Sequence, residues 1–349
     1  MHEFRIYNLL RPFGWLYGLA AGIRNRLFDN GTLKSVSFTI PVISIGNITV
    51  GGTGKTPHTE YLASLLKDSY RIAILSRGYG RHTKGFILSD AHSDSRMIGD
   101  EPLQVKKRFP DVDIAVSENR ATGIRKLMEL RSPQVIILDD AFQHRKVTPS
   151  LNILLVNYNR NILDDAMLPA GRLRENAKGR KRAHIIIVSK CPANLSATAM
   201  DELKSKLAVS PEQQVFFTTL EYGDLYPLDS RAANPPQDCP VLAVTGIADP
   251  ALMEAQLRKS HSDVRLLSYP DHHDFGQRDI QKMQSLLQNM PSGSIIVTTS
   301  KDAARLSGMK IDDSLMEKIF VLPVMPAFIT SQDGFRDTIL KHIETFNAQ

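Results

Sequence analysis

The sequence predicts an α/β protein in which a parallel sheet, covered by helices on both faces, carries a P-loop and is followed by a smaller α/β unit. Three observations lead to this prediction. Short apolar runs alternate with helix-like stretches along the chain. These runs are continuous rather than alternating in polarity, which is typical of strands buried on both faces. A glycine-dense turn, GNITVGGTGKTP (46–57), joins the first run to a helix-like stretch.

The first set of runs predicts the main sheet. Helix-like stretches at 57–66 and 119–130 lie between some of its members, and strand–helix alternation of this kind produces parallel strands with right-handed crossovers. The predicted strands are residues 41–46, 71–76, 113–117, 134–140, 151–157 and 184–190.

A second set of runs follows a polar, proline-rich stretch at 228–240, which predicts a linker or surface loop. This set predicts a smaller, Rossmann-like α/β domain. Its predicted strands are 241–247, 264–269, 294–302 and 319–325. The boundary falls between 205 and 240, and the predicted divisions are 1–28, 29–215 and 216–349.

The N-terminal segment, residues 1–28, is rich in aromatic and aliphatic side chains with arginines among them. Its uncharged run, 12–23, is shorter than the roughly 20 residues of a membrane span. Arg11 and Pro12 interrupt the apolar run, which argues against a secretory signal. Two interpretations remain: a helix at a membrane interface, with its arginines at the headgroups, or a helix packed on the core.

The composition limits the partners and the chemistry. The chain has 349 residues, a net charge of +6 and a pI near 9.2, which favours nucleotides, phosphorylated substrates or an anionic membrane surface as partners. Its two cysteines, Cys191 and Cys239, lie far apart, which excludes a disulfide framework and a cysteine-based zinc site.

The glycine-dense turn has the order that a P-loop requires: strand, turn, Gly-Lys-Thr, helix. Backbone N–H groups of such a turn point at phosphate oxygens, the lysine reaches the β- and γ-phosphates, and the threonine hydroxyl binds Mg²⁺. The strict pattern has glycine where this chain has Thr49. The predicted phosphate-binding residues are Gly51, Gly52, Thr53, Gly54, Lys55 and Thr56.

Acidic residues end another predicted strand. Asp139 and Asp140 follow the run QVIIL, and ligands of parallel sheets bind at the carboxyl edge of the strands. Either carboxylate is suited to hold Mg²⁺, directly or through water. The sequence leaves open which of the two does so.

Other polar groups lie in predicted loops. SRGYGR (76–81) and GRLRENAKGRKR (171–182) supply arginines that suit phosphate oxygens, although a solvated charge run is the alternative for 178–182. GDEP (99–102) supplies Asp100. YPDHHDF (269–275) lacks a third metal ligand at helical spacing, so an acid–base role for one histidine is the preferred interpretation.

Seven motifs in this order resemble the tetraacyldisaccharide 4'-kinase family: GNITVGGTGKTP, SRGYGR, GDEP, DDAFQH, PAGRLRE, PDHHDF and VTTSKDAARL. The resemblance extends from the N-terminal helix to about residue 306. It implies a phosphotransferase that uses ATP and Mg²⁺ to phosphorylate the 4'-hydroxyl of a tetraacyldisaccharide 1-phosphate lipid A precursor. It also implies a peripheral or monotopic protein at the cytoplasmic face of the bacterial inner membrane, with its site between two domains and no nucleic-acid partner.

The same resemblance implies residue roles. Asp100 is expected to be the catalytic base, polarised by His272. The expected metal ligands are Thr56, Asp139, Asp140 and Glu175. The expected substrate-binding residues are Arg77, Tyr79, Arg120, His144 and Arg174. Ala141 departs from the family pattern, in which glycine is commoner after the aspartate pair.

Two other P-loop classes are alternatives. A membrane-associated ATPase switch of the partitioning type also has a glycine-rich loop and an amphipathic anchor, but its loop has lysine where this chain has Val50. A GTPase needs a guanine-reading N-K-x-D motif, and only fragments of that motif occur here. Competition between ATP and GTP distinguishes these classes.

Overall fold

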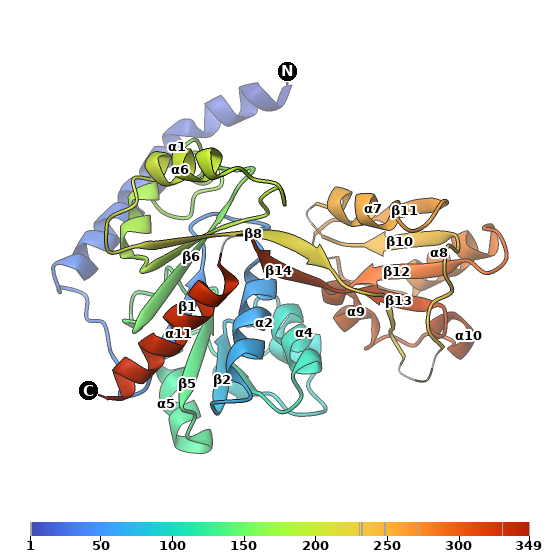
Figure 1. Cartoon of the computed structure of the whole chain (residues 1–349), viewed down its shortest axis with the longest axis horizontal. Helices are drawn as coiled ribbons and strands as arrows, with labels where there is room; N and C mark the ends of the chain where they lie inside the picture. The colour runs from blue at the N-terminus through green and yellow to red at the C-terminus, as the bar shows by residue number, and fades with distance from the viewer. Residues whose placement is uncertain are drawn as a thin grey trace.

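The computed structural model describes residues 2–229, 231, 233–247, 249–271, 273–329 and 331–348, with side chains from Leu10 onward. The described chain contains a large and a small β-sheet, each with helices packed on it (Figure 1). We call the parts built on these sheets the large lobe (residues 30–222 and 324–348) and the small lobe (residues 226–322).

The large sheet has the strand order β14-β8-β7-β6-β1-β5-β2-β4-β3 within the described residues. Its interior pairs are parallel, and β3 and β14 pair antiparallel at the two edges. The strands are β1 (Val42–Gly46), β2 (Ile72–Ser76), β3 (Ile87–Leu88), β4 (Asp113–Val116), β5 (Val135–Asp139), β6 (Leu151–Asn157), β7 (Ile185–Ser189), β8 (Gln214–Tyr222) and β14 (Val324–Phe328). The predicted large parallel sheet is therefore confirmed.

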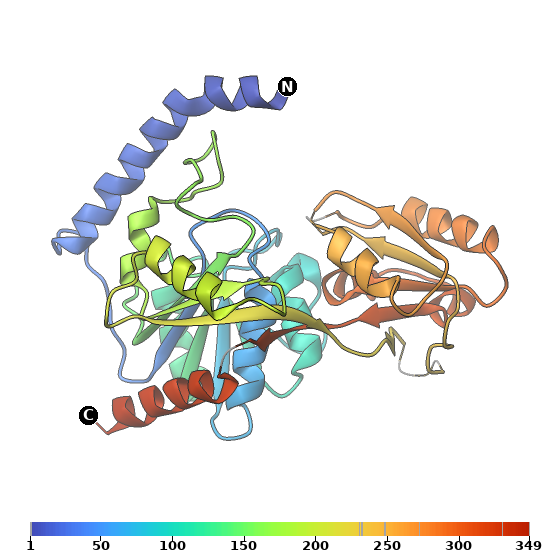
Figure 2. The same ribbon diagram turned by 45° about the horizontal axis from the view of Figure 1, so that its top comes forward.

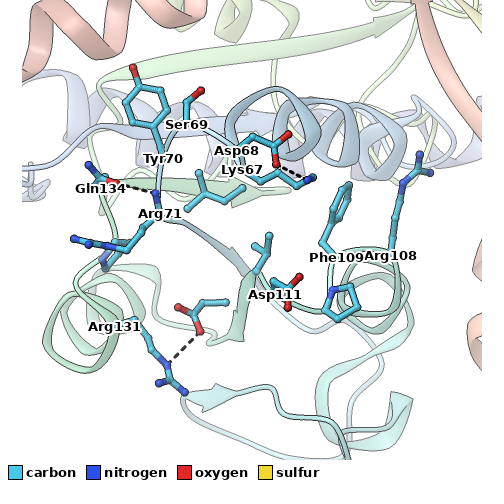
Figure 3. A pocket seen from close by; sticks show the side chains of 15 residues that line it. Lys67, Asp68, Ser69, Tyr70, Arg71, Arg108, Phe109, Asp111, Arg131 and Gln134 are labelled. Atoms are coloured by element: carbon cyan, nitrogen blue, oxygen red, sulfur yellow. Dashed lines mark hydrogen bonds and ion pairs between the residues drawn. The ribbon is translucent and has the colours of Figure 1, made fainter.

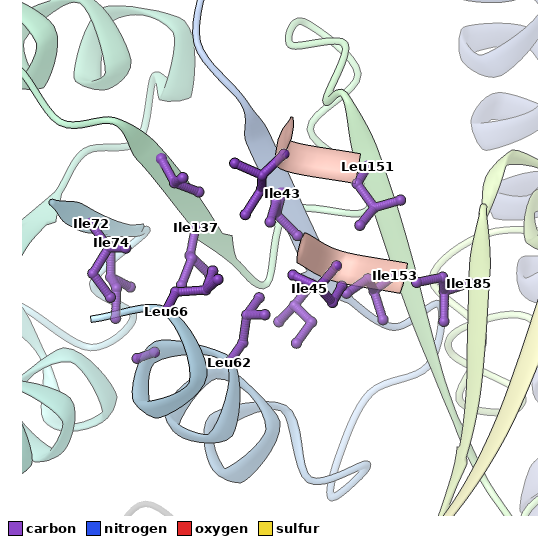
Figure 4. Close-up of a cluster of buried hydrophobic side chains, with 14 of the residues drawn as sticks. Ile43, Ile45, Leu62, Leu66, Ile72, Ile74, Ile137, Leu151, Ile153 and Ile185 are labelled. Atoms are coloured by element: carbon purple, nitrogen blue, oxygen red, sulfur yellow. The ribbon is translucent and has the colours of Figure 1, made fainter. Parts of the chain in front are cut away.

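Helices cover both faces of this sheet, which explains the continuous apolar runs. On one face, α2 (Lys55–Leu66), α4 (Asp100–Arg108) and α11 (Gln332–Asn347) pack against alternate strand residues such as Ile43 and Ile45 (Figure 4). On the other face, α5 (Arg120–Arg131) and α6 (Ala197–Lys206) cover the intervening residues. Full burial of each such aliphatic side chain contributes roughly 1.5–3 kcal/mol. Short helices α3 (Ser95–Ile98) and η1 (Ala177–Arg182) lie in the connections.

The small sheet has the order β11-β10-β12-β13-β9, parallel except for the β13–β9 pair. Its strands are β9 (Tyr226–Pro227), β10 (Val241–Thr245), β11 (Val264–Ser268), β12 (Ile295–Thr299) and β13 (Ile319–Leu322). Its helices are α7 (Ala251–Leu257), α8 (Gln277–Gln288), α9 (Ser300–Leu306) and α10 (Asp313–Met316).

The two lobes are joined by a two-stranded ribbon, β8 and β14, which runs between them in Figure 1. β8 pairs with β7 of the large sheet and continues to Tyr222, which lies beyond the predicted division at residue 216 but within the predicted range of 205 to 240. The prediction that 216–349 form one domain is wrong. The chain returns through β14, and α11 buries Phe335, Ile339 and Ile343 in the core of the large lobe.

The N-terminal helix, α1 (His2–Asp29), runs along the outside of the large lobe (Figure 2). Its glycines allow close packing, since a Cβ on Gly14 would lie 2.9 Å from the Met167 carbonyl oxygen. Several of its large apolar side chains remain exposed, namely Phe13, Trp15, Leu16, Tyr17, Leu19 and Ile23. In the described part of the chain, no helix has the length and apolar content to cross a membrane.

Candidate active site

The glycine-dense turn connects the carboxyl end of β1 to the start of α2, as the sequence predicts. Gly51 and Gly54 have φ angles of 87° and 80°, a region that glycine enters without the steric cost of a Cβ. α2 begins at Lys55 directly after Gly54, so its unpaired N–H groups and the positive end of its dipole face this turn. The turn therefore has the geometry of an anion-binding loop.

Thr49, the departure from the strict motif, lies in an extended segment rather than in a tight turn. It forms an antiparallel bridge with Leu173, and the Val50 N–H donates to the Arg172 carbonyl oxygen at 2.8 Å. The φ angle here is not in the left-handed region, so glycine is not required. The same pairing brings Arg174 next to the loop, because its N–H donates to the Ile48 carbonyl oxygen.

Asn47 is a residue of the loop that the sequence analysis did not single out. It is fully buried, and its Nδ2 donates to Thr53 Oγ1 at 2.7 Å. Lys55 Nζ donates to Asn47 Oδ1 at 3.4 Å and lies 3.8 Å from Asp140 Oδ2. Asn47 therefore fixes both the loop and its lysine. In the sequence, only the position of Asn47 inside GNITVGGTGKTP pointed to this role.

Asp139 and Asp140 lie at the carboxyl end of β5, beside this loop. Asp139 is buried and accepts hydrogen bonds from Thr59 Oγ1 at 3.0 Å and from Ser76 Oγ at 3.4 Å. Burial, with the negative charges of Glu101 and Asp140, raises the pKa of the Asp139 carboxyl to about 7. A bound cation would remove this cost by keeping the group ionised.

Asp140 has the opposite electrostatic environment. Burial raises its pKa, but Lys55 and Arg174, together with Arg120, outweigh that effect and hold the pKa at about 2. Arg174 Nη1 and Nη2 donate to the two carboxylate oxygens at 3.1 and 2.8 Å. Asp140 also has a φ of 46°, which is unusual for a residue with a Cβ and is typical of functional sites.

Glu175 is almost fully buried and is engaged on both oxygens. Arg182 Nη2 donates to them at 2.9 and 2.8 Å, Gln143 Nε2 donates to Oε1 at 2.9 Å, and Asn25 Nδ2 of α1 donates to Oε2 at 3.0 Å. In this arrangement Glu175 ties α1 to the site. Its predicted role as a metal ligand stays a prediction.

A cavity of about 430 Å³ lies between α1 and Asp140. It brings together predicted substrate and metal residues from distant parts of the sequence: Arg77, Asp140, His144, Arg174 and Glu175. From α1 it is lined by Tyr17, Ala20, Ala21, Arg24 and Asn25. Tyr79 and Arg120 are not among its lining residues, and Tyr79 is 69% exposed.

Arg120 is buried beneath this site. Its Nη1 donates to the Ser117 carbonyl oxygen, whereas its Nε and Nη2 have no hydrogen-bond partner in the described residues. Burial lowers the pKa of the guanidinium to about 10, partly offset by Asp139 and Asp140. Burial, then Arg120 and Arg77, lowers the pKa of His144 to about 4. Arg120 therefore supplies an incompletely paired positive charge close to the aspartates.

Asp100 lies at the first position of α4. The preceding Gly99 has a φ of 90°, and a Cβ there would lie 2.8 Å from the Tyr79 carbonyl oxygen. A Cβ on Gly78 would likewise lie 2.7 Å from the Ile98 carbonyl oxygen. The SRGYGR and GDEP motifs therefore touch backbone to backbone, which explains both glycines. The influence of Glu101 on Asp139 places this end of α4 near the aspartate pair.

The PDHHDF motif contains two adjacent histidines, His272 and His273. His272, the predicted partner of Asp100, lies outside the described residues. His273 is held in the small lobe, where its Nε2 is 2.9 Å from Asp279 Oδ2 and its ring stacks on Tyr269 at a centroid distance of 4.4 Å. These contacts give His273 a structural role.

His58 is a second residue that the sequence analysis missed. It is buried on α2, where its Nδ1–H donates to the Gly54 carbonyl oxygen at 2.7 Å, and its Nε2 accepts from Thr218 Oγ1 of β8 at 3.1 Å. It thus links the P-loop to the ribbon between the lobes. Burial lowers its pKa to about 4, so the folded protein holds it neutral.

The pH dependence of stability should report on His58. Between pH 6.5 and 4 the unfolded chain protonates this histidine and the folded chain does not, so stability is lost as pH falls. We expect His58→Asn to remove about 3 kcal/mol of the decrease in unfolding free energy over this window. Urea titrations at pH 7.5 and 4 measure it, with the exposed His92→Asn as control. The prediction would be contradicted if the unfolding free energies of the two variants decreased equally between pH 7.5 and 4.

A larger cavity, about 630 Å³, lies at the opposite edge of the sheet, near the amino ends of β2, β4 and β5 (Figure 3). Some of its charged groups pair with one another, as in the Arg131–Asp113 ion pair at 3.2 Å and the Lys67–Asp68 ion pair at 2.6 Å. It contains none of the predicted site residues. Volume alone is therefore a poor guide to the site, which lies at the carboxyl edge.

Comparison with known proteins agrees with this geometry. The family model described as LpxK, tetraacyldisaccharide-1-P 4'-kinase, matches residues 6–344. A tetraacyldisaccharide 4'-kinase of Bacteroides fragilis (strain YCH46) is 43% identical, covering 98% of this chain and 94% of the relative. One of Phocaeicola vulgatus is 46% identical, covering 94% and 92%.

A solved structure is also similar over nearly the whole chain. It is the "apo" form of LpxK from Aquifex aeolicus in complex with ATP, with a TM-score of 0.75 and 32% sequence identity. The match covers 97% of this chain and 99% of that one. The resemblance predicted from the seven motifs is confirmed.

Proposed function

Because the chain belongs to the LpxK family of tetraacyldisaccharide-1-P 4'-kinases, we propose how its own residues carry out that reaction. The chain is an ATP-dependent lipid A 4'-kinase that uses Mg²⁺. It transfers the γ-phosphoryl group to the 4'-hydroxyl of a tetraacyldisaccharide 1-phosphate. The match across residues 6–344 favours this activity over an ATPase switch of the partitioning type. The observation that carries the residue assignment is the P-loop beside Asp139 and Asp140.

The loop of residues 51–56 fits a triphosphate. Gly51 and Gly54 adopt left-handed backbone conformations, and α2 directs its free N–H groups into the turn. Lys55 lies between Asn47 and Asp140, from which its ammonium can turn to the β- and γ-phosphates. Gly52 and Thr53 complete the loop.

The residues beside the loop also fit magnesium. Among the described residues no cluster of three or more His, Cys, Asp or Glu side chains could hold a metal alone. Mg²⁺ needs no such cluster, since it is commonly held by one or two carboxylates together with substrate phosphates and water. We assign Thr56, Asp139 and Asp140 as its protein ligands. Glu175 would first have to leave Arg182. When bound, the ion neutralises charge on the transferring phosphoryl group.

Asp100 is the proposed proton acceptor. Phosphoryl transfer has a loose transition state, so the enzyme gains most from positioning and charge neutralisation. In the reaction the bond between the γ-phosphorus and the β–γ bridging oxygen breaks, and a bond to the 4'-oxygen forms. Asp100 takes the hydroxyl proton, and ADP leaves. His272 is the proposed partner of Asp100.

The cavity between α1 and Asp140 is the proposed site of the disaccharide head. Arg77, His144 and Arg174 line it and offer donors to sugar hydroxyls and phosphate. Arg120 and Tyr79 are assigned to the same substrate by their motifs. Arg174 would exchange its contact with Asp140 for one with substrate, which would free Asp140 for the metal.

We assign the exposed apolar side of α1 to the membrane surface that contains the substrate, at the cytoplasmic face of the inner membrane. Extracting a lipid with several acyl chains costs about 0.8 kcal/mol for each CH₂ group transferred to water. A helix that carries Trp15 and Leu16 outward and lines the substrate cavity with Tyr17 avoids this cost. Arg11 and Arg26 suit anionic headgroups.

Introducing negative charge on the exposed apolar side of α1 should weaken membrane binding without affecting nucleotide binding. Trp15→Glu with Leu16→Glu is expected to weaken binding to vesicles of phosphatidylcholine and phosphatidylglycerol by about 10- to 100-fold, because two apolar anchors are lost. Vesicle cosedimentation measures this, and ATP affinity should not change. Leu252→Glu, at an exposed position on α7, is the control. Undiminished vesicle binding by the double variant would exclude α1 as the anchor.

The activity itself is tested directly. Purified protein is incubated with γ-labelled ATP, Mg²⁺ and a monophosphorylated tetraacyldisaccharide, and the products are separated by thin-layer chromatography. We expect a labelled bisphosphorylated lipid, with GTP supporting the reaction less well. Release of labelled phosphate without labelled lipid would instead indicate an ATPase.

A further inference from the structure

Asp100 is held by a side chain of the other lobe. Arg305 of α9 contacts it through Nε at 2.8 Å and through Nη2 at 2.7 Å. Both contacts are to the same carboxylate oxygen, Oδ2. Two donors of one guanidinium therefore hold this oxygen in place, and a positive charge lies directly against the carboxylate.

Arg305 is itself fixed from behind. Its third nitrogen, Nη1, donates to Asp302 Oδ1 at 2.8 Å. The other oxygen of Asp302 accepts from Thr245 Oγ1 at 2.8 Å, from the Gly246 N–H at 3.0 Å and from Thr299 Oγ1 at 2.8 Å. Asp302 is fully buried, and the Arg305 side chain is only 5% exposed. The position of Arg305 is thus set by the end of β10 and the start of α9.

The lobes pack together around this contact. Ile98 and Leu103, from the large lobe, share a buried apolar cluster with Ala304 of α9. Lys107 of α4 reaches across as well and donates to the Ala304 carbonyl oxygen at 3.4 Å and to Ser307 Oγ. Lys107 belongs to the same interface but makes these contacts without touching Asp100, which makes it a matched control.

We propose that Arg305 is a positioning residue for phosphoryl transfer, supplied by the small lobe to orient Asp100 and keep it ionised. The base is then correctly held only while α9 rests on α4, so the small lobe takes part in the reaction through Asp302 and Arg305. This inference rests on the proposed role of Asp100 as the base. It assigns a function to the last of the seven motifs, VTTSKDAARL.

A neighbouring guanidinium favours the ionised form of a carboxylate and lowers its pKa. Removing it should therefore raise the pKa of Asp100 and move the acid limb of the kcat profile to higher pH. The other charged side chains on the two helices that meet here are Glu101, Lys106, Lys107 and Arg108 on α4, and Lys301 and Asp302 on α9. Lys301 is paired with Asp271.

The test compares Arg305→Gln, Arg305→Lys and Lys107→Met in the full-length protein. Arg305→Gln is expected to lower kcat by about 10- to 100-fold through misplacement of the base, with KM for ATP unchanged. The acid limb of its kcat profile should move to higher pH by about one pH unit or more. Arg305→Lys keeps the positive charge but has no planar guanidinium. It should therefore return the acid limb of the kcat profile to its original pH and restore part of the rate. Lys107→Met should keep the original limb.

Each result has a definite meaning once melting temperatures confirm that the variants fold. A kcat for Arg305→Gln within about twofold of the original, or a loss of rate that is equal at every pH, would overturn the role of Arg305. Neither result bears on Asp100 itself, whose own substitution tests the proposed base. If the Asp100 variant loses activity while Arg305→Gln keeps it, only the positioning role fails.

Discussion

Replacing Asp100 by asparagine is expected to lower kcat by about 10²- to 10⁴-fold, because that is the usual contribution of a positioned general base. Asparagine keeps the shape of the side chain but cannot accept the proton of the 4'-hydroxyl. Asp100 belongs to α4 and not to the P-loop, so ATP should bind as before. Steady-state kinetics with the lipid acceptor, together with equilibrium binding of an ATP analogue, measure the two effects separately.

Asp94→Asn is a suitable control for the Asp100 variant. Asp94 caps the neighbouring helix α3 by accepting from the Met97 N–H at 2.8 Å. We expect it to affect stability slightly, by about 1 kcal/mol or less, and kcat hardly at all. Normal turnover by the Asp100→Asn enzyme would show that Asp100 is not the base. The proposed nucleotide site does not depend on this result.

Replacing Lys55 by methionine is expected to raise KM for ATP and to lower kcat by about 10²- to 10³-fold, as when one preorganised charge is removed from a transition state. Methionine keeps most of the aliphatic stem and removes the ammonium. Both parameters should change, because the lysine contacts the phosphates before and during transfer. Titration of a fluorescent ATP analogue and initial rates measure the two losses.

Lys67→Met is the matched control for Lys55. Lys67 follows the last turn of the same helix, α2, and pairs with Asp68 at 2.6 Å on the surface. It lies at the end of α2 remote from the loop, so neither KM nor kcat should change. A Lys55→Met protein that bound ATP and turned over normally would mean that the nucleotide binds elsewhere.

The apolar runs predicted β1, β2, β4, β5, β6 and β7 of the large sheet, because a strand covered on both faces must be apolar along its whole length. The same rule missed β8, which is only partly buried along its length, and it also missed β14 and α11. Residues 324–328 leave the small lobe and pair with β8, and α11 then places Phe335 in the core of the large lobe. No local pattern says to which sheet a late segment returns, because that depends on which surface remains uncovered after the rest has folded.

The P-loop, the aspartate pair and the family could be predicted from residue types at fixed short spacings along the chain. The contact of Arg305 with Asp100 and the link that His58 makes between Gly54 and Thr218 could not be predicted in this way. These contacts join residues that are 205 and 160 positions apart. Spacing along the chain carries no information about such pairs, because the packing of helices on two separate sheets brings them together.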